Sequence, residues 1–189
     1  MKRLSFYIAN NDYVDYLKSE ETKARGFTRV PNLVYSDNQK QKFLCGIVFE
    51  HNGLPYFVPV SSYKQRQRDN FLIYNEDGRV LSSLRFNYMF PIPANLVTEY
   101  DISSIEDQKY RFLIQNELRY CRHYQSAILH RAAKTYERVT EGKDPFLQKN
   151  ACDFRLLEKC CREYEAAHSP ATARAASEKA SRRDVDPEI

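Results

Sequence analysis

Two neighbouring serines and a lysine close an apolar segment of this sequence. Ser61, Ser62 and Lys64 are followed at once by two further cations, Arg66 and Arg68, with no acid between them. Hydroxyls can orient a phosphate by hydrogen bonds, and a preorganised cation stabilises negative charge that develops on it. A seryl hydroxyl is a poor base by itself, so proton abstraction would need a lysine with a lowered pKa. The pattern suits metal-free cleavage of a phosphodiester, although strand-end serines are more commonly turn or edge residues.

A hairpin is expected to hold these residues at the end of a strand. An apolar run from Phe43 to Glu50 reaches a second apolar run through the turn residues Asn52-Gly53, a strong signal for antiparallel pairing. Pro59 cannot donate to a sheet ladder, so the second strand is expected at an edge or a bulge. Lys42 and Lys64 then lie at the start of one strand and the end of its partner, where side chains can approach each other.

The first half of the chain is expected to be rich in strands. The expected elements are, in order, a strand at 4–9, a helix at 13–20 capped by Asn10, Asn11 or Asp12, a polar loop at 22–41, the first hairpin, and a second hairpin of strands at 71–74 and 80–86 with an Asp77-Gly78 turn. Short turns between antiparallel strands predict an α+β fold with a small, strongly curved sheet or a partly open barrel.

The second half is expected to be helical. Apolar residues at helical spacing predict one long helix near 110–140, which Gly142 and Pro145 would end, and a shorter helix after Asp153. The opposite side of the long helix carries Arg119, His123, His130, Lys134 and Arg138. Such a side is commonly a solvated face, and RNA binding is the alternative. The Ala-, Ser- and Arg-rich segment 169–189 predicts a disordered tail behind one domain at 1–168.

Composition excludes several classes of protein. The chain has 189 residues and a net charge of +4, which permits nucleic-acid binding without demanding it. No apolar stretch reaches the roughly 20 residues of a membrane helix, so a cytoplasmic protein without membrane contact is expected. The five cysteines contain no C-x-x-C pair, and no histidine pair has the spacing of metal ligands, so neither metal nor cofactor is expected. Gly-rich phosphate loops and hydrolase elbows are absent from the sequence.

Several segments together resemble a known family. Lys42 with 43–50, Val58 to Lys64, Phe90-Pro91-Ile92-Pro93 and Lys109 to Leu113 follow the order seen in the ToxN/AbiQ family, the endoribonuclease toxins of type III toxin-antitoxin systems. The resemblance extends from the N-terminus to about Tyr164. It implies a PemK-like sheet extended by helices and a metal-independent, sequence-specific endoribonuclease of antiviral defence. Attack by the 2′-hydroxyl would leave a 2′,3′-cyclic phosphate on a cellular or phage RNA.

The resemblance also implies a partner and a set of site residues. The partner is an RNA antitoxin of pseudoknotted repeats, which the toxin processes and with which it forms a ring-like assembly. The implied catalytic residues are Ser61, Ser62, Lys64, Lys42, Tyr13 and Tyr110, and the residues expected to bind RNA are Arg66, Arg68, Arg119, His123, His130 and Lys134. Family members carry Thr-Ser-Pro-Lys where this chain has Ser-Ser-Tyr-Lys, so at Tyr63 the family's local backbone and base preference do not carry over directly.

Two other readings remain open. A non-catalytic RNA-binding or regulatory module would use the same cations and aromatic residues but would tolerate loss of Ser62. A protein-interaction domain would leave the cationic run from Lys64 to Arg68 without a role.

Overall fold

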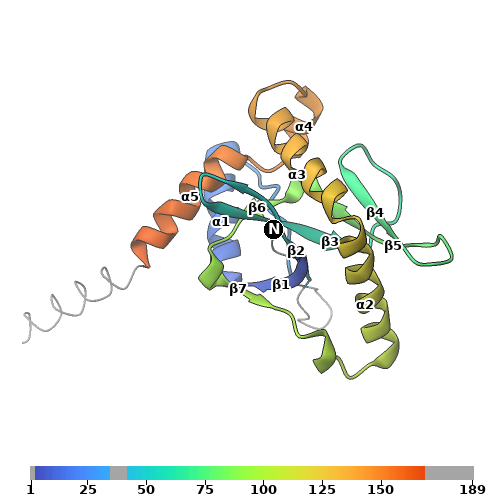
Figure 1. Ribbon diagram of the computed structural model, residues 1–189. Coiled ribbons are helices and arrows are strands. Elements are labelled where there is room, and N and C mark those ends of the chain that lie inside the picture. The colour runs from blue at the N-terminus through green and yellow to red at the C-terminus, as the bar shows by residue number, and fades with distance from the viewer. Residues whose placement is uncertain (1–2, 35–41, 169–189) are drawn as a thin grey trace, which may run out of the picture.

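The computed structural model describes residues 3–34 and 42–168. Its strands are β1 (Ser5–Ala9), β2 (Leu44–His51), β3 (Leu54–Ser61), β4 (Asn70–Tyr74), β5 (Val80–Arg85), β6 (Phe90–Pro91) and β7 (Val97–Glu99). They form one antiparallel sheet in the order β4-β5-β3-β2-β1-β7, with β6 paired to β3. Because the two end strands, β4 and β7, do not pair with each other, the sheet is not closed into a barrel. The expected α+β class is confirmed, and an open sheet is the architecture found (Figure 1).

Both expected hairpins are present. In the first, Asn52 and Gly53 have φ values of 50° and 78°, which suits the tight turn that an Asn-Gly pair forms. In the second, Gly78 has a φ of 77° between β4 and β5. The β2–β3 register sets Leu44 opposite Pro59, so the residues just before β2 lie beside the residues that end β3.

Five helices complete the described chain: α1 (Asn11–Arg25), α2 (Gln108–His123), α3 (Gln125–Thr140), α4 (Pro145–Asn150) and α5 (Phe154–Ala167). The Asn10 side chain caps α1 and the Asp153 side chain caps α5, as their positions in the sequence predict. Residues 22–25 were expected in a loop, which is wrong. The helix continues because Gly26, with a φ of 76°, supplies the left-handed residue that ends it. The tail at 169–189 and loop positions 35–41 lie outside the described residues.

The long helix expected near 110–140 is instead two helices that meet at Tyr124. This residue has φ −98° and ψ 21°, so it ends α2 and begins α3. The apolar repeat keeps its seven-residue step from Cys121 to Ile128 across the break, and both residues are buried. Because the break preserves the spacing of the apolar residues, this spacing does not reveal it, and the sequence predicted one continuous helix.

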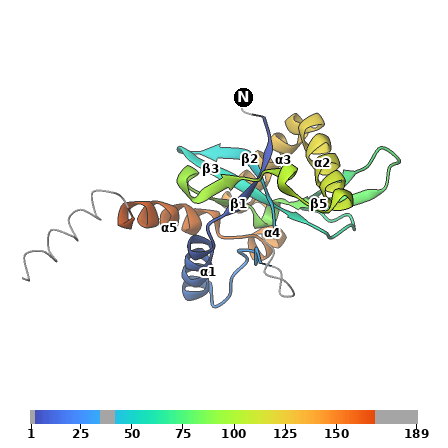
Figure 2. The same ribbon diagram turned by 90° about the horizontal axis from the view of Figure 1, so that it is seen from below.

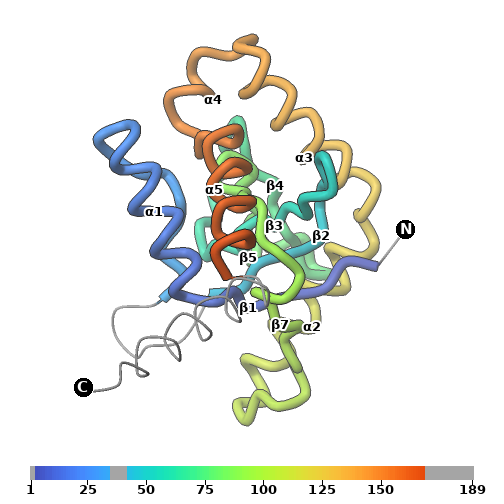
Figure 3. Tube along the Cα trace, turned by 90° about the vertical axis from the view of Figure 1, so that its left-hand side faces the viewer, coloured from blue at the N-terminus to red at the C-terminus, as the bar shows by residue number. Residues whose placement is uncertain are grey.

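The helices pack on the sheet in two groups. α2 lies against the β4–β5 hairpin and α3 contacts β2 (Figure 1), while α1 and α5 lie side by side at the other end (Figures 2 and 3). Glu158 of α5 accepts hydrogen bonds of 2.8 Å from the hydroxyls of Tyr56 on β3 and Tyr136 on α3. This contact ties the two helical groups to the hairpin. No helix in the described ranges is both long and apolar enough to cross a bilayer.

Gly46 gives a direct test of packing beneath the hairpin. A methyl group at this position would lie 2.2 Å from the buried ring of Phe57 on β3. We expect Gly46→Ala to lower the free energy of unfolding by about 1–3 kcal/mol, the usual cost of overpacking a core. Chemical denaturation measures the effect. Repeating it in a Phe57→Leu background should reduce the cost, and an unchanged cost in that background would contradict the packing argument.

Candidate active site

The end of β3 opens into a cavity of about 250 Å³. Its walls come from the segment before β2, the end of β3 and the end of β5 with the turn that follows: Pro31, Asn32, Leu33, Lys42, Pro59, Val60, Ser61, Ser62, Arg85 and Tyr88. The cavity therefore brings together three of the residues singled out in the sequence, Lys42, Ser61 and Ser62. Lys64 does not belong to its walls.

The β2–β3 pairing places Lys42 beside the serines. The backbone N–H of Val60 donates to the carbonyl of Phe43 at 3.0 Å, which continues the ladder past the start of β2. Lys42 Nζ donates to the Asn32 carbonyl at 3.0 Å, which holds the ammonium at the cavity wall. Ser62 is exposed, and no described residue forms a hydrogen bond with its hydroxyl. That hydroxyl is therefore available to a ligand.

The strand ends at Ser61, because the next residues turn. Ser61 Oγ accepts a hydrogen bond from the Tyr63 backbone N–H at 3.2 Å, and the Tyr63 carbonyl accepts one from Ser83 Oγ at 2.6 Å. The buried Asn70 side chain then donates to the Gln65 carbonyl at 2.8 Å. These side-chain bonds replace the ladder beyond Ser61, so Lys64, Arg66 and Arg68 lie on a loop and not on a continued strand.

Glu117 is a buried carboxylate of α2. Burial raises the pKa of Glu117, and the Ser82 hydroxyl and the charge of Lys64 oppose that shift. The two lysines differ in place: Lys42, before β2, lines the cavity, and the exposed Lys64, on the loop after β3, lies outside its walls.

Arg85 is a cavity residue that the sequence did not single out. Its guanidinium carbon lies 4.8 Å from the ring centre of Tyr88 and 5.5 Å from that of Tyr63, so two aromatic faces hold the cation. The Nε of Arg85 is buried, and within the described part of the chain nothing accepts its hydrogen bond. A guanidinium held in this way can bind a phosphate through two parallel hydrogen bonds. Tyr63, the departure from the family pattern, is one of the residues that position it.

A buried carboxylate supports the opposite wall of the cavity. Glu21 of α1 accepts hydrogen bonds from Thr28 Oγ1 at 2.7 Å and from the backbone N–H of Arg29 at 2.6 Å and Val30 at 3.2 Å. These bonds fix the segment that leads directly into Pro31. Glu21 is fully buried and was not recognised in the sequence, where it reads as one of several helix glutamates.

The two tyrosines implied by the resemblance lie outside the walls of the cavity. Tyr13 is buried, and its hydroxyl donates to the Pro91 carbonyl at 2.8 Å. Burial raises the pKa of Tyr13, and the neighbouring Cys161 adds to the shift, so the phenol stays protonated. Tyr110 is half-buried in the first turn of α2.

The residues expected to bind RNA are spread over two faces. Arg66 is exposed on the loop, whereas Arg68 pairs with Asp144 at 3.4 Å. Arg119 and His123 line a second cavity beside the β4–β5 hairpin, and His130 and Lys134 are exposed on α3. The expected basic side of the helices is therefore accessible at these four positions.

The cavity brings together two hydroxyls, a lysine and a stacked arginine on an open antiparallel α+β fold. Such a site is suited to binding a phosphate group. Residues 5–162 match the family model described as toxin ToxN of type III toxin-antitoxin systems. The chain belongs to this family of toxins.

Curated relatives agree with this assignment. The chain is 26% identical over 170 residues to the endoribonuclease ToxN of Bacillus thuringiensis subsp. kurstaki. The aligned region covers 85% of this chain and 84% of the relative. It is 23% identical over 168 residues to the endoribonuclease AbiQ of Lactococcus lactis subsp. lactis, covering 82% and 86%.

Solved structures share the fold. One, from work on selective toxin inhibition by a non-coding RNA pseudoknot, superposes with a TM-score of 0.75 at 26% identity and covers 87% of this chain and 99% of the other. The structure of AbiQ, described as a lactococcal anti-phage endoribonuclease, superposes with a TM-score of 0.74 at 22% identity over the same shares, which supports the fold.

Proposed function

We propose that this toxin is a metal-independent endoribonuclease whose active site is the cavity at the end of β3. The observation that carries the proposal is the convergence of Ser61, Ser62, Lys42 and Arg85 around one space. Hydroxyl donors and cations can bind a phosphodiester there and stabilise the charge that develops on it. The relatives named endoribonucleases support the reaction class.

The chemistry assigned to the site is an internal displacement. The ribose 2′-oxygen forms a bond to phosphorus and the bond from phosphorus to the 5′-oxygen breaks. The proton leaves the 2′-hydroxyl and a proton reaches the departing 5′-oxygen, so the products are a 2′,3′-cyclic phosphate and a 5′-hydroxyl. Ser62 orients the phosphate or the 2′-hydroxyl, and Ser61 both shapes the turn and adds a second hydroxyl. Lys42, Arg85 and the nearby Lys64 stabilise the phosphorane charge.

The two tyrosines receive supporting roles in this proposal. Tyr13 donates to the carbonyl of Pro91, and β6, which contains Pro91, pairs with β3. We therefore assign Tyr13 to positioning the strand that carries the serines. We assign Tyr110, at the start of α2, to orienting the RNA.

The proposed partners are RNAs. A similar solved toxin is described as selectively inhibited by a non-coding RNA pseudoknot, which supports an antitoxin of pseudoknotted repeats that this toxin processes and with which it forms a ring-like assembly in the cytoplasm. Cellular or phage RNA is the proposed substrate. Arg66, Arg68, Arg119, His123, His130 and Lys134 are proposed to contact RNA backbones, because Lys and Arg supply most sequence-independent affinity for nucleic acids.

Cleavage in the presence of a chelator tests the mechanism. We expect the purified toxin to cut total cellular RNA at an unchanged rate in excess EDTA, since Lys42 and Arg85 of the cavity can supply the positive charge that the reaction needs. End analysis should find a cyclic phosphate on one product and a 5′-hydroxyl on the other. Complete loss of cleavage that returns only with a divalent cation would reject the mechanism, and no cleavage under any condition would favour the non-catalytic RNA-binding module.

A matched pair of cations on the loop separates chemistry from binding. Lys64→Ala should slow single-turnover cleavage at saturating toxin by roughly 100-fold, because it removes charge stabilisation made mainly in the transition state. Arg66→Ala should leave the saturated rate intact and weaken binding, with a shallower dependence of affinity on salt. If Lys64→Ala cuts at the wild-type rate once saturated, Lys64 serves binding, and Lys42 with Arg85 supplies the charge.

A further inference from the structure

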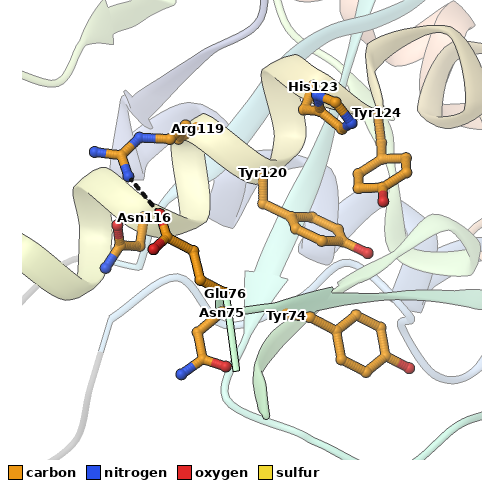
Figure 4. A pocket seen from close by; sticks show the side chains of 8 residues that line it. All are labelled: Tyr74, Asn75, Glu76, Asn116, Arg119, Tyr120, His123 and Tyr124. Atoms are coloured by element: carbon orange, nitrogen blue, oxygen red, sulfur yellow. Dashed lines mark hydrogen bonds and ion pairs between the residues drawn. The ribbon is translucent and has the colours of Figure 1, made fainter. Parts of the chain in front are cut away.

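A second cavity, of about 280 Å³, lies between the β4–β5 hairpin and α2. Its lining residues are Tyr74, Asn75, Glu76, Asn116, Arg119, Tyr120, His123 and Tyr124. Figure 4 shows the three tyrosines on one side and, on the other, Asn75, Glu76, Asn116 and Arg119, which we call the rim. The reaction proposed above uses none of the three tyrosines. The cavity is near the lower limit of ordinary ligand pockets, so it suits one planar group rather than a duplex.

The aromatic side chains form a cluster of tilted rings in contact with one another. The ring centres of Tyr120 and Tyr124 are 4.5 Å apart, and that of Tyr74 lies 5.9 Å from Tyr120. Phe71 of β4 lies 6.3 Å from Tyr124 and supports the group from the sheet. A cluster that served only to pack the hairpin on the helix would close over itself. Here the cavity stays open, and Tyr124 is 41% exposed.

The break between α2 and α3 falls at this cluster. Tyr124 is the residue with non-helical backbone angles, and its ring stands beside that of Tyr120, one turn earlier. Tyr124 is three residues after the buried Cys121 and four before the buried Ile128, so it lies on the sheet-facing side of the helices, yet its ring is 41% exposed at the cavity.

The rim carries the groups that a nucleotide needs. Arg119 forms an exposed ion pair of 3.2 Å with Glu76, which an incoming phosphate can replace at little cost. Asn75 and Asn116 present amides that can pair with the edge of a base. Burial raises the pKa of Tyr120 to about 12, so its hydroxyl stays neutral and can donate a hydrogen bond.

The cavity lies close to the proposed active site across the sheet. The sheet register sets Ser61 of β3 opposite Ser83 of β5, and Ser83 opposite Leu72 of β4. Tyr74 of the cavity is two residues beyond Leu72 on β4. The serines and the tyrosines are therefore separated by two strand spacings of roughly 5 Å each and two residues along β4, a distance that a short RNA strand can span.

We propose that this cavity binds one unpaired nucleobase of a single-stranded RNA segment flanking the cleaved bond. The base stacks on Tyr120 and Tyr124, and Arg119 or His123 contacts the adjoining phosphate. Unpaired RNA bases are commonly recognised by stacking on aromatic side chains and by hydrogen bonds to their edges. The inference rests on the proposed function, because it takes RNA as the ligand, and it adds a subsite that reads RNA beyond the reacting nucleotide.

An abasic scan of a defined RNA tests the subsite. A short single-stranded RNA spanning a mapped cleavage position carries one 2′-deoxynucleotide there, which removes the attacking hydroxyl, and one abasic residue placed in turn at each flanking position. With wild-type toxin, one abasic position should weaken binding by roughly 5- to 100-fold, the usual loss for one stacked base. With Tyr124→Ala, binding of the intact RNA should fall by a similar factor, and the same abasic residue should cost almost nothing further.

Two further variants exclude a general loss of structure. Tyr120→Phe keeps the ring and should retain most of the affinity. Phe112→Ala removes a residue of α2 that is 62% exposed and outside the cavity, and it should bind as the wild type does. The subsite is overturned if no abasic position weakens binding to wild-type toxin, or if Phe112→Ala weakens binding as much as Tyr124→Ala does. In either case the toxin still cuts unmodified RNA, so the proposed reaction would stand. Cleavage at the deoxynucleotide would instead overturn the proposed reaction.

Discussion

Ser62→Ala is expected to lower the rate of RNA cleavage by about 100- to 1,000-fold, the range seen when one preorganised donor to a developing charge is lost. The hydroxyl is exposed at the mouth of the cavity and forms no hydrogen bond to any described residue. Its removal should therefore leave the free energy of unfolding nearly unchanged. Expression of the wild-type toxin should arrest growth and expression of the variant should not, and single-turnover cleavage measures the rate directly.

Ser126 provides the matched control. It is an exposed serine of α3, outside both cavities, so Ser126→Ala should arrest growth and cut RNA as the wild type does. Ser61→Ala should have a smaller effect than Ser62→Ala on chemistry but should also loosen the turn, since Ser61 Oγ accepts from the Tyr63 N–H. A folded Ser62→Ala variant that arrests growth fully would remove Ser62 from the reaction.

Local signals in the sequence were sufficient for most of the sheet and for the helix ends. The Asn52-Gly53 turn and the Gly78 turn impose backbone angles that few other residues adopt, so both hairpins could be predicted. Asn10 and Asp153 cap helices through their own side chains. The hairpin register predicted that Lys42 and Lys64 can approach each other across the sheet, and the structure places Lys42 in the cavity with Ser61 and Ser62 but leaves Lys64 outside its walls.

The parts that escaped prediction depend on contacts between distant segments. Arg85 enters the cavity because β5 pairs with β3 and because Tyr63 and Tyr88 hold its guanidinium, and its sequence context is that of any strand residue. Lys64 lies outside the cavity walls, because hydrogen bonds from Ser83 and Asn70 redirect the loop after Ser61. The cavity of three tyrosines likewise needs the hairpin and α2 to meet.

Glu21→Ala is expected to destabilise the toxin by about 3–5 kcal/mol, the range for removing one partner from a buried charge pair. Glu21 Oε1 accepts from Arg25 Nη1 at 2.8 Å and from the Asp153 N–H at 2.7 Å, in addition to its bonds with the segment before Pro31. Truncation leaves these donors without their acceptor. The melting temperature should fall by roughly 6–20 °C, given about 2–4 °C for each kcal/mol in a chain of this size.

Glu20→Gln on the same helix is the control, because Glu20 forms an ion pair with the largely exposed Lys23, and losing that pair should cost less than about 1 kcal/mol. Equal melting temperatures for the Glu20 and Glu21 variants would contradict the buried role.

The pH dependence of unfolding gives an independent test of Glu21. Burial alone would raise the pKa of this carboxyl, but hydrogen bonds from Thr28, Asp153, Arg29 and Arg25 outweigh burial and lower it. A carboxyl whose pKa is lower in the folded state adds stability above its unfolded pKa of about 4.3. That stability is lost as the pH falls through the folded pKa.

Wild-type toxin should therefore lose stability steeply on acidification below that unfolded value, and Glu21→Gln should show a shallower decline, since an amide does not titrate there. Identical slopes for the two proteins would mean that the Glu21 pKa is not lowered on folding. Because Glu21 holds the segment that becomes the Pro31 to Leu33 wall, we also expect Glu21→Gln to lose cleavage activity at temperatures below its unfolding transition, where Glu20→Gln retains it.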